Sequence, residues 1–233
     1  MTADERLALI RVKIERAKQH ILQLESDIRT FFDTRPYVVG TKQNPQTRQL
    51  IYDIVTVRET PKILASITGD ALQNLWSALD HLAYQLVLVG TGKPGPFRHV
   101  YFPIDNDATK YEADKMRKVQ GMRPAAIKAI DTVKPYKGGN DALWRLDQLN
   151  NVDKHRLLIT VGSAFRSVDI NAVICPHVHT LHPDFTAMLP PLFVRPADRL
   201  FPLKAGDELF IDTPDSKVNE QMQFRFDVAF GEP

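Results

Sequence analysis

Two long stretches with helical periodicity, residues 3–31 and 61–89, limit what this chain can fold into more than any other feature. In the first stretch apolar side chains recur every three or four residues and charges fill the opposite face: Leu7, Ile10, Ile14, Ala17, Ile21, Leu24 and Ile28. Leucines supply the same stripe in the second stretch. A helix of this length is too long to pack on a small core alone, so we expect the two helices to lie along one another.

The rest of the chain predicts a mixture of helices and strands. Residues 37–39 and 50–57 are rich in β-branched and aromatic residues and flank a polar turn, which is typical of a hairpin. Further helices are expected over residues 110–118, 123–131 and 140–156. From residue 161 the apolar pattern is that of strands. The sequence therefore predicts an α+β fold, with a mainly helical core over 1–160, a β-hairpin inserted near 36–57, and a β-rich part over 161–233 that packs on the same domain.

Local signals predict where the long helices begin and end. Thr2 or Asp4 can cap the first helix, and Thr60 can cap the second. Gly90 suits the end of the second helix. Gly69 either weakens that helix or allows another helix to approach closely.

Composition excludes several classes of protein. The 233 residues are 43% hydrophobic and 25% charged, as in ordinary soluble globular proteins, and the net charge of +2 is too small to attract nucleic acid by bulk electrostatics. The single cysteine, Cys175, excludes an intramolecular disulfide and fits a reducing compartment. We find no signal peptide and no apolar run long enough for a membrane span. A cytoplasmic location without a membrane partner is expected.

The segment from Asn140 to Leu158 places polar groups where apolar ones belong. On a helical wheel Asn150 and Asp153 fall on the same face as three leucines, so that face should be buried. Burying an amide or a carboxylate is costly unless it has partners. We therefore interpret Asn150 and Asp153 as structural polar residues, and Asp153→Ala should cost about 3 kcal/mol if the partner of Asp153 is a charge.

A polar stripe runs along the 61–89 helix opposite its leucines: Asp70, Asn74, Ser77, His81 and Gln85. It is either a solvated face or a polar seam against a neighbouring helix. Asp80 lies a quarter-turn to one side of it. A carboxylate beside an imidazole can support proton transfer, which makes Asp80 and His81 candidate catalytic residues.

The run from Asp153 to Arg156 is the densest cluster of ionisable groups. On the wheel His155 lies with Trp144, Gln148 and Asn151. Basic residues at a helix C-terminus also stabilise the helix dipole without doing chemistry. The functional interpretation makes His155 a catalytic residue and gives ligand binding to Asn151, Lys154 and Arg156.

No motif predicts a metal or a cofactor. His177, His179 and His182 follow Cys175 closely, but no carboxylate stands at a recognised metalloenzyme spacing and no paired cysteines accompany them. GTGKPG lacks the spacing of a phosphate-binding loop.

Four segments in order, NLWSALDHLAYQL, YFPI, KPY and LWRLDQLNNVDKHRLL, carry a resemblance. Over residues 65–160 the chain resembles a family of uncharacterised bacterial and phage-associated proteins with ALDH and LNNxDKHR signatures. The resemblance implies no activity, but it implies the following signature positions: Asp80, His81, Asn151, Asp153, Lys154, His155 and Arg156.

A looser resemblance is to HEPN-type helical proteins, many of which are ribonucleases or toxin partners. Those enzymes use an arginine four to six residues before a histidine. Trp76 stands five residues before His81, and Arg145 stands ten before His155, so the chain departs from that pattern.

Three functions are compatible with these residues. The first is binding of, or action on, a small polar or nucleic-acid ligand at a polar site between the 61–89 and 140–156 helices. The second is a HEPN-like, metal-independent ribonuclease acting on RNA. The third is a structural or partner-binding protein in which the polar motifs only hold helices together. A homodimer through the long helices fits each of them. We also expect a side chain of Asp80 or His81 within about 8 Å of residues 151–156, because the buried polar groups of the two segments can hydrogen-bond to one another or through one water.

Overall fold

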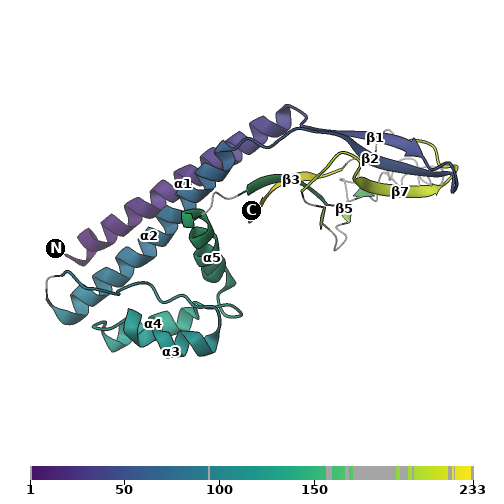
Figure 1. Cartoon of the computed structure of the whole chain (residues 1–233). Coiled ribbons are helices and arrows are strands. Elements are labelled where there is room, and N and C mark those ends of the chain that lie inside the picture. Colours follow the sequence, from purple (N-terminus) through teal and green to yellow (C-terminus); the bar gives the residue numbers. More distant parts are fainter. Residues whose placement is uncertain are drawn as a thin grey trace, which may run out of the picture. The chain divides into compact units, whose positions relative to one another are not determined.

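The computed structural model describes residues 2–93, 95–155, 159–165, 168–169, 193–194, 199–200, 202–219, 222 and 224–231. Over these residues the chain has the predicted α+β fold, with helices first and most strands later (Figure 1). It forms two compact units. The helical unit holds the chain up to Ser26 and from Ile63 through the last helix, and the β unit holds Asp27–Lys62 and the strands between Ile159 and Gly231.

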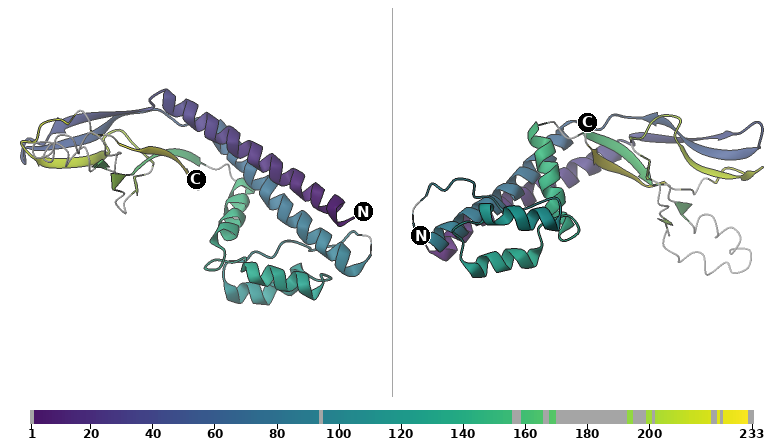
Figure 2. Two further views of the ribbon diagram at one scale, coloured as in Figure 1. Left: turned by 180° about the vertical axis from the view of Figure 1, so that it is seen from behind. Right: turned by 60° about the horizontal axis from the view of Figure 1, so that its bottom comes forward.

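The two long helices form as their periodicity predicts. α1 (Ala3–Asp33) and α2 (Ile63–Thr91) lie side by side and run in opposite directions (Figures 1 and 2). At the start of α1 the amide of Thr2 donates to Glu5 Oε2 at 2.7 Å, and the amide of Glu5 donates to Thr2 Oγ1 at 3.2 Å. This reciprocal pair is a capping box and confirms Thr2 as the cap.

The ends of α2 differ from the prediction by two residues. The helix begins at Ile63, after Pro61, and continues past Gly90 to Thr91. Gly92 ends it, with a φ of 64° and an amide that donates to Leu88 O at 3.0 Å. Gly90 has a different role inside the helix, because its missing Cβ leaves room for the backbone of Gly121.

The core of the helical unit lies where α2 meets the short helices α3 (Ala108–Lys118) and α4 (Pro124–Val133). Its buried members are Ala83, Val87, Phe102, Ile104, Val119, Met122 and Ile130. The segment before α3 is fixed on this core by polar groups as well. The buried Asp105 pairs with Lys118 at 2.9 Å, and the amide of Asp105 donates to Pro135 O at 3.1 Å. α5 (Asp141–His155) follows and completes the unit.

In the β unit the predicted hairpin pairs with a strand that lies far along the chain. β1 (Tyr37–Gln43) pairs with β2 (Gln49–Val57), and β2 pairs with β7 (Glu208–Pro214), all antiparallel. The sequence alone did not predict the β2–β7 pairing. A buried cluster that includes Phe31, Tyr37, Ile54, Leu203 and Leu209 covers this sheet.

The remaining strands form two further small sheets in the β unit. β3 (Ile159–Phe165) lies between β6 (Arg199–Leu200) and β8 (Phe226–Gly231), and β4 (Val168–Asp169) pairs with β5 (Phe193–Val194). Most of the strand expected around Cys175 lies outside the described residues, as do His177, His179 and His182. None of the helices in the described part of the chain is long and apolar enough to cross a membrane.

Candidate functional site

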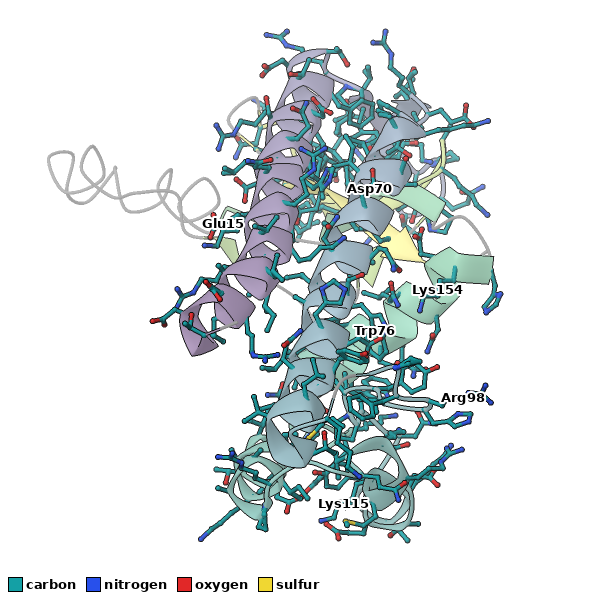
Figure 3. The ribbon with its side chains drawn as sticks, turned by 90° about the vertical axis from the view of Figure 1, so that its left-hand side faces the viewer. Glu15, Asp70, Trp76, Arg98, Lys115 and Lys154 are labelled. Atoms are coloured by element: carbon teal, nitrogen blue, oxygen red, sulfur yellow. The ribbon has the colours of Figure 1, made fainter. Side chains whose placement is uncertain are left out.

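The two signature segments come together where α2 meets α5. We call this contact the α2–α5 seam and define it by Gly69, Trp76, Asp80, Asp153 and Lys154. The carboxylate of Asp153 lies where a Cβ of Gly69 would stand, so the glycine is what allows the close approach. The Lys154 Nζ lies 5.4 Å from the centroid of the Trp76 ring, as a cation–π contact (Figure 3).

Asp80 anchors the segment that follows α2. Its half-buried carboxylate accepts a hydrogen bond from the amide of Phe102 at 3.1 Å. Burial raises the pKa of Asp80, while the Phe102 amide and the charge of Lys154 oppose that rise. The contacts of Lys154 with Trp76 and of Asp153 with Gly69 show that the two signature segments meet, while the approach of Asp80 or His81 to within about 8 Å of residues 151–156 stays a prediction. Asp80 therefore fixes the backbone at Phe102 through this hydrogen bond, and its carboxylate is also part of the seam.

Asn150 is buried, as the wheel predicts, with 0% of its surface exposed. Neither its Nδ2 nor its Oδ1 has a hydrogen-bond partner among the described residues. Burial of an unpaired amide costs free energy, and in native structures such groups are uncommon. The expectation that Asn150 is satisfied by structural partners is therefore not met within the described part of the chain.

Asp153 is half-buried, and the described residues give it no ion pair. Burial raises its pKa, and the negative charge of Asp70 raises it further. A cationic partner for Asp153 is therefore not found among the described residues, and Arg156 lies outside them. The physical reason is that its face of α5 meets α2 at Gly69 and Asp70, neither of which carries a positive charge.

A polar network that the sequence did not predict lies beside the seam. Asn106 Oδ1 accepts from Trp144 Nε1 at 3.3 Å and from Gln148 Nε2 at 3.4 Å. Asp147 accepts from Asn151 at 3.2 Å and from Gln148 at 3.0 Å, and burial raises the pKa of Asp147. Asn106 stands two residues after YFPI, and no pattern in the sequence marks it as a partner of Trp144 or Gln148.

The candidate histidines are not brought into one described pocket. His81 is exposed and lines a groove between α1 and α2 together with residues such as Arg6 and Lys13. His155 is exposed at the end of α5. Lys154 is exposed over Trp76, and Asn151 is exposed beside Asp147. Arg156, the remaining candidate, lies outside the described residues.

Within the described ranges no group of three or more histidine, cysteine, aspartate or glutamate side chains could hold a metal ion. Comparison of the chain with models of known protein families, with curated proteins and with solved structures finds no match. The functional argument therefore depends on the chemistry of the site itself.

Proposed function

We propose that the protein binds a small polar ligand at the α2–α5 seam, and that this ligand carries a positive charge or several hydrogen-bond donors. One observation carries the proposal. The Trp76 ring, with the Lys154 ammonium 5.4 Å from its centroid, lies at the seam with the carboxylates of Asp80 and Asp153, and burial raises the pKa of both. A raised pKa means that the surroundings compensate the anionic form less well than water does. A donor-rich or cationic ligand would supply that compensation.

The Trp76 ring supports a cationic ligand in particular. It already accepts one ammonium group, that of Lys154, whose charge also acts on Asp80. An amine held over an aromatic face beside a carboxylate is a recurrent way of recognising organic cations. Lys154 is exposed, and a lysine ammonium stands on a flexible four-carbon stem. A ligand amine can therefore take its place over the ring. Asn151 is exposed and donates through Nδ2 to Asp147, which leaves its amide oxygen to accept from a polar ligand.

Fluorescence tests this proposal directly because the chain has only two tryptophans. The Trp144→Phe variant leaves Trp76 as the single emitter. Titration with spermidine should change the Trp76 emission in a saturable way, and Asp80→Asn should weaken the effect about tenfold, as expected for loss of a charged hydrogen-bond partner. Adenosine monophosphate is the anionic control and should have no effect. An equal response to both compounds, or no response to spermidine, would reject a cation site at the seam.

The ribonuclease alternative remains a separate hypothesis with its own test. Carboxylates around the seam would repel RNA phosphate, and that favours the polar-ligand proposal over this one. The ribonuclease hypothesis requires the purified protein to cleave single-stranded RNA in excess EDTA, and requires His155→Ala to abolish cleavage while the fold is retained. If neither RNA nor spermidine gives a signal, the purely structural function becomes the leading hypothesis.

Two further proposals concern context. A homodimer through the long helices is supported by exposed apolar side chains on α1, where Ile21 and Leu22 are 39% and 65% exposed. Sedimentation of the wild type and of an Ile21→Ser, Leu22→Ser variant tests it, because loss of apolar contact should favour the monomer. The second proposal is a cytoplasmic location, which rests on the single cysteine.

A further inference from the structure

The groove between α1 and α2 lies within the helical unit and differs from the seam in charge. Its cavity volume is about 430 Å³, which is in the range of small-molecule sites. The lining residues are Arg6, Leu9, Ile10, Val12, Lys13, His81, Tyr84 and Gln85. Three of these are basic and none is acidic. The other lining side chains from α1 are apolar.

The basic groups are held at the groove in ways that leave them able to bind an anion. Arg6 is fixed by one hydrogen bond from its Nη1 to Gln85 Oε1 at 2.7 Å, and a guanidinium has further donors. Lys13 has no ion pair or hydrogen bond among the described residues. His81 is exposed and comes from the opposite wall of the groove. Basic side chains from two helices thus border one hollow.

The groove also has an apolar wall, which α1 supplies. Ile10 is buried, whereas Leu9 and Val12 are exposed by 54% and 65%. Exposed apolar side chains that border a basic hollow gain free energy when an apolar body covers them. We infer that the α1–α2 groove binds a small organic anion, with its phosphate or carboxylate at Lys13 and Arg6 and its apolar body against Leu9 and Val12. This inference does not rest on the function proposed for the seam.

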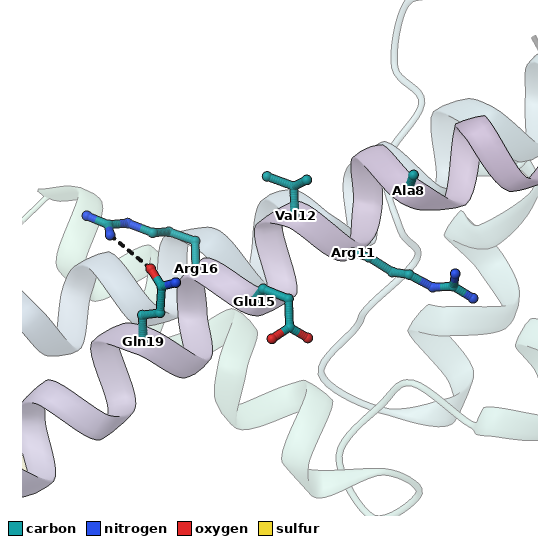
Figure 4. Close-up of a pocket in the computed structure, with 6 residues that line it drawn as sticks. All are labelled: Ala8, Arg11, Val12, Glu15, Arg16 and Gln19. Carbon is teal, nitrogen blue, oxygen red and sulfur yellow. Dashed lines mark hydrogen bonds between the residues drawn. The ribbon is translucent and has the colours of Figure 1, made fainter.

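A second hollow on α1 supplies the comparison. It is lined by α1 alone, at Ala8, Arg11, Val12, Glu15, Arg16 and Gln19, and its arginines are accompanied by an acid (Figure 4). The Arg16 Nη1 also donates to Gln19 Oε1 at 3.1 Å. A hollow on one helix has no second wall to enclose a ligand. Arg11 therefore makes a matched control for Lys13, because both are basic residues on the same helix.

Calorimetric titration of the full chain tests the inference, with octyl phosphate and octanoate as probes kept below their micellar concentrations. At least one of them should bind, and the stronger of the two identifies the head group. Lys13→Gln should weaken binding about tenfold or more, as expected for loss of a charged hydrogen bond, and Arg11→Gln should change it less than about twofold. Circular dichroism confirms that both variants are folded.

Two further titrations separate the parts of the ligand. Octylammonium should not bind, and inorganic phosphate should bind more weakly than octyl phosphate because it lacks the apolar body. Leu9→Ser should weaken octyl phosphate about threefold or more and leave inorganic phosphate unchanged. The inference would be overturned if octylammonium bound as tightly as the anionic probes. It would also be overturned if Lys13→Gln and Arg11→Gln weakened binding equally, or if neither octyl phosphate nor octanoate bound.

Discussion

The two sides of α2 present opposite chemistry. Toward α5, the helix presents its own Asp80 and meets the carboxylate of Asp153, and burial raises the pKa of both. Toward α1, the groove holds basic side chains from both helices and no acidic one. Neighbouring residues of one helix, Asp80 and His81, contribute to these different surroundings. The contrast teaches that the helix packed against each face decides what that face can bind.

The polar stripe of α2 does not belong to one surface. Asp70, at the start of the stripe, contributes to raising the pKa of Asp153. His81 and Gln85, at its end, line the groove between α1 and α2. Hydrogen bonds within the helix occupy part of its middle, since Gln73 donates to Ser77 at 3.3 Å and Asn74 donates to Asp70 O at 2.8 Å. A stripe with a single period therefore serves a seam at one end and a groove at the other.

The largest expected difference between the two sides comes from the adjacent pair Asp80 and His81. Asp80→Ala should lower the free energy of unfolding by about 2 kcal/mol, because it leaves the amide of the buried Phe102 without an acceptor. His81→Ala removes an exposed side chain and should change that free energy by less than about 0.5 kcal/mol. Urea denaturation of both variants measures the difference, and equal losses would contradict the contrast.

The next effect concerns the close approach of α5 to Gly69. Gly69→Ala should destabilise the protein by about 1–2 kcal/mol, because the new Cβ overlaps the Asp153 carboxylate. In an Asp153→Gly background the overlap is gone, and the same change should become stabilising through helix propensity, by up to about 1 kcal/mol. A double-mutant cycle by urea denaturation gives the coupling.

Gly90→Ala is the matched control for that cycle. Gly90 is also inside α2, but it faces the backbone of Gly121, which no change at Asp153 can move. Its substitution should destabilise the protein equally in both backgrounds. Rescue of Gly90→Ala by Asp153→Gly, or the same loss for Gly69→Ala in both backgrounds, would mean that the contact at Gly69 does not govern the seam.

Much of this arrangement could be predicted because it depends on local pattern. Periodicity predicts both long helices, and the helical wheel predicts the burial of Asn150. The capping signal offers Thr2 or Asp4, and the structure has Thr2 as the cap. Gly69 was expected either to weaken α2 or to admit a neighbour, and the second expectation is confirmed. These are properties that a few residues determine among themselves.

What could not be predicted depends on partners distant in sequence. Nothing near Asn106 indicates that Trp144 and Gln148 will donate to it, and nothing near the hairpin identifies β7 as its neighbour. The wheel likewise places Asp153 on a buried face but cannot show that Asp70 is the charge across from it. Sign and distance of a partner charge are set by tertiary packing, and the periodicity of one helix carries no information about them.

Substitution of Asn150 tests whether its buried, unpaired amide lowers the stability of the protein. Asn150→Leu should raise the free energy of unfolding by about 1 kcal/mol, because it replaces an unpaired buried amide by an apolar group of similar size. Asn151→Leu is the control, since Asn151 is exposed and already donates to Asp147. It should give no gain. Thermal denaturation of both variants decides, and a loss on Asn150→Leu would show that the amide is satisfied in the folded protein.

The smallest expected effect is a dependence on pH at Asp153. Its pKa is raised above the ordinary value of 3.8, so the folded chain holds this proton more tightly than the unfolded chain does. The contribution to stability is therefore fully present below 3.8 and is lost as the pH rises through the raised pKa. Asp153→Asn removes that loss and should stabilise the protein by about 0.5 kcal/mol at about pH 7, with no gain at about pH 3. Asp114→Asn, at a carboxylate without a hydrogen-bond or ion-pair partner among the described residues, should show no such difference between the two pH values. Urea denaturation at both pH values measures the change, and a gain from Asp153→Asn that persists at the lower pH would mean that charge at the seam is not its cause.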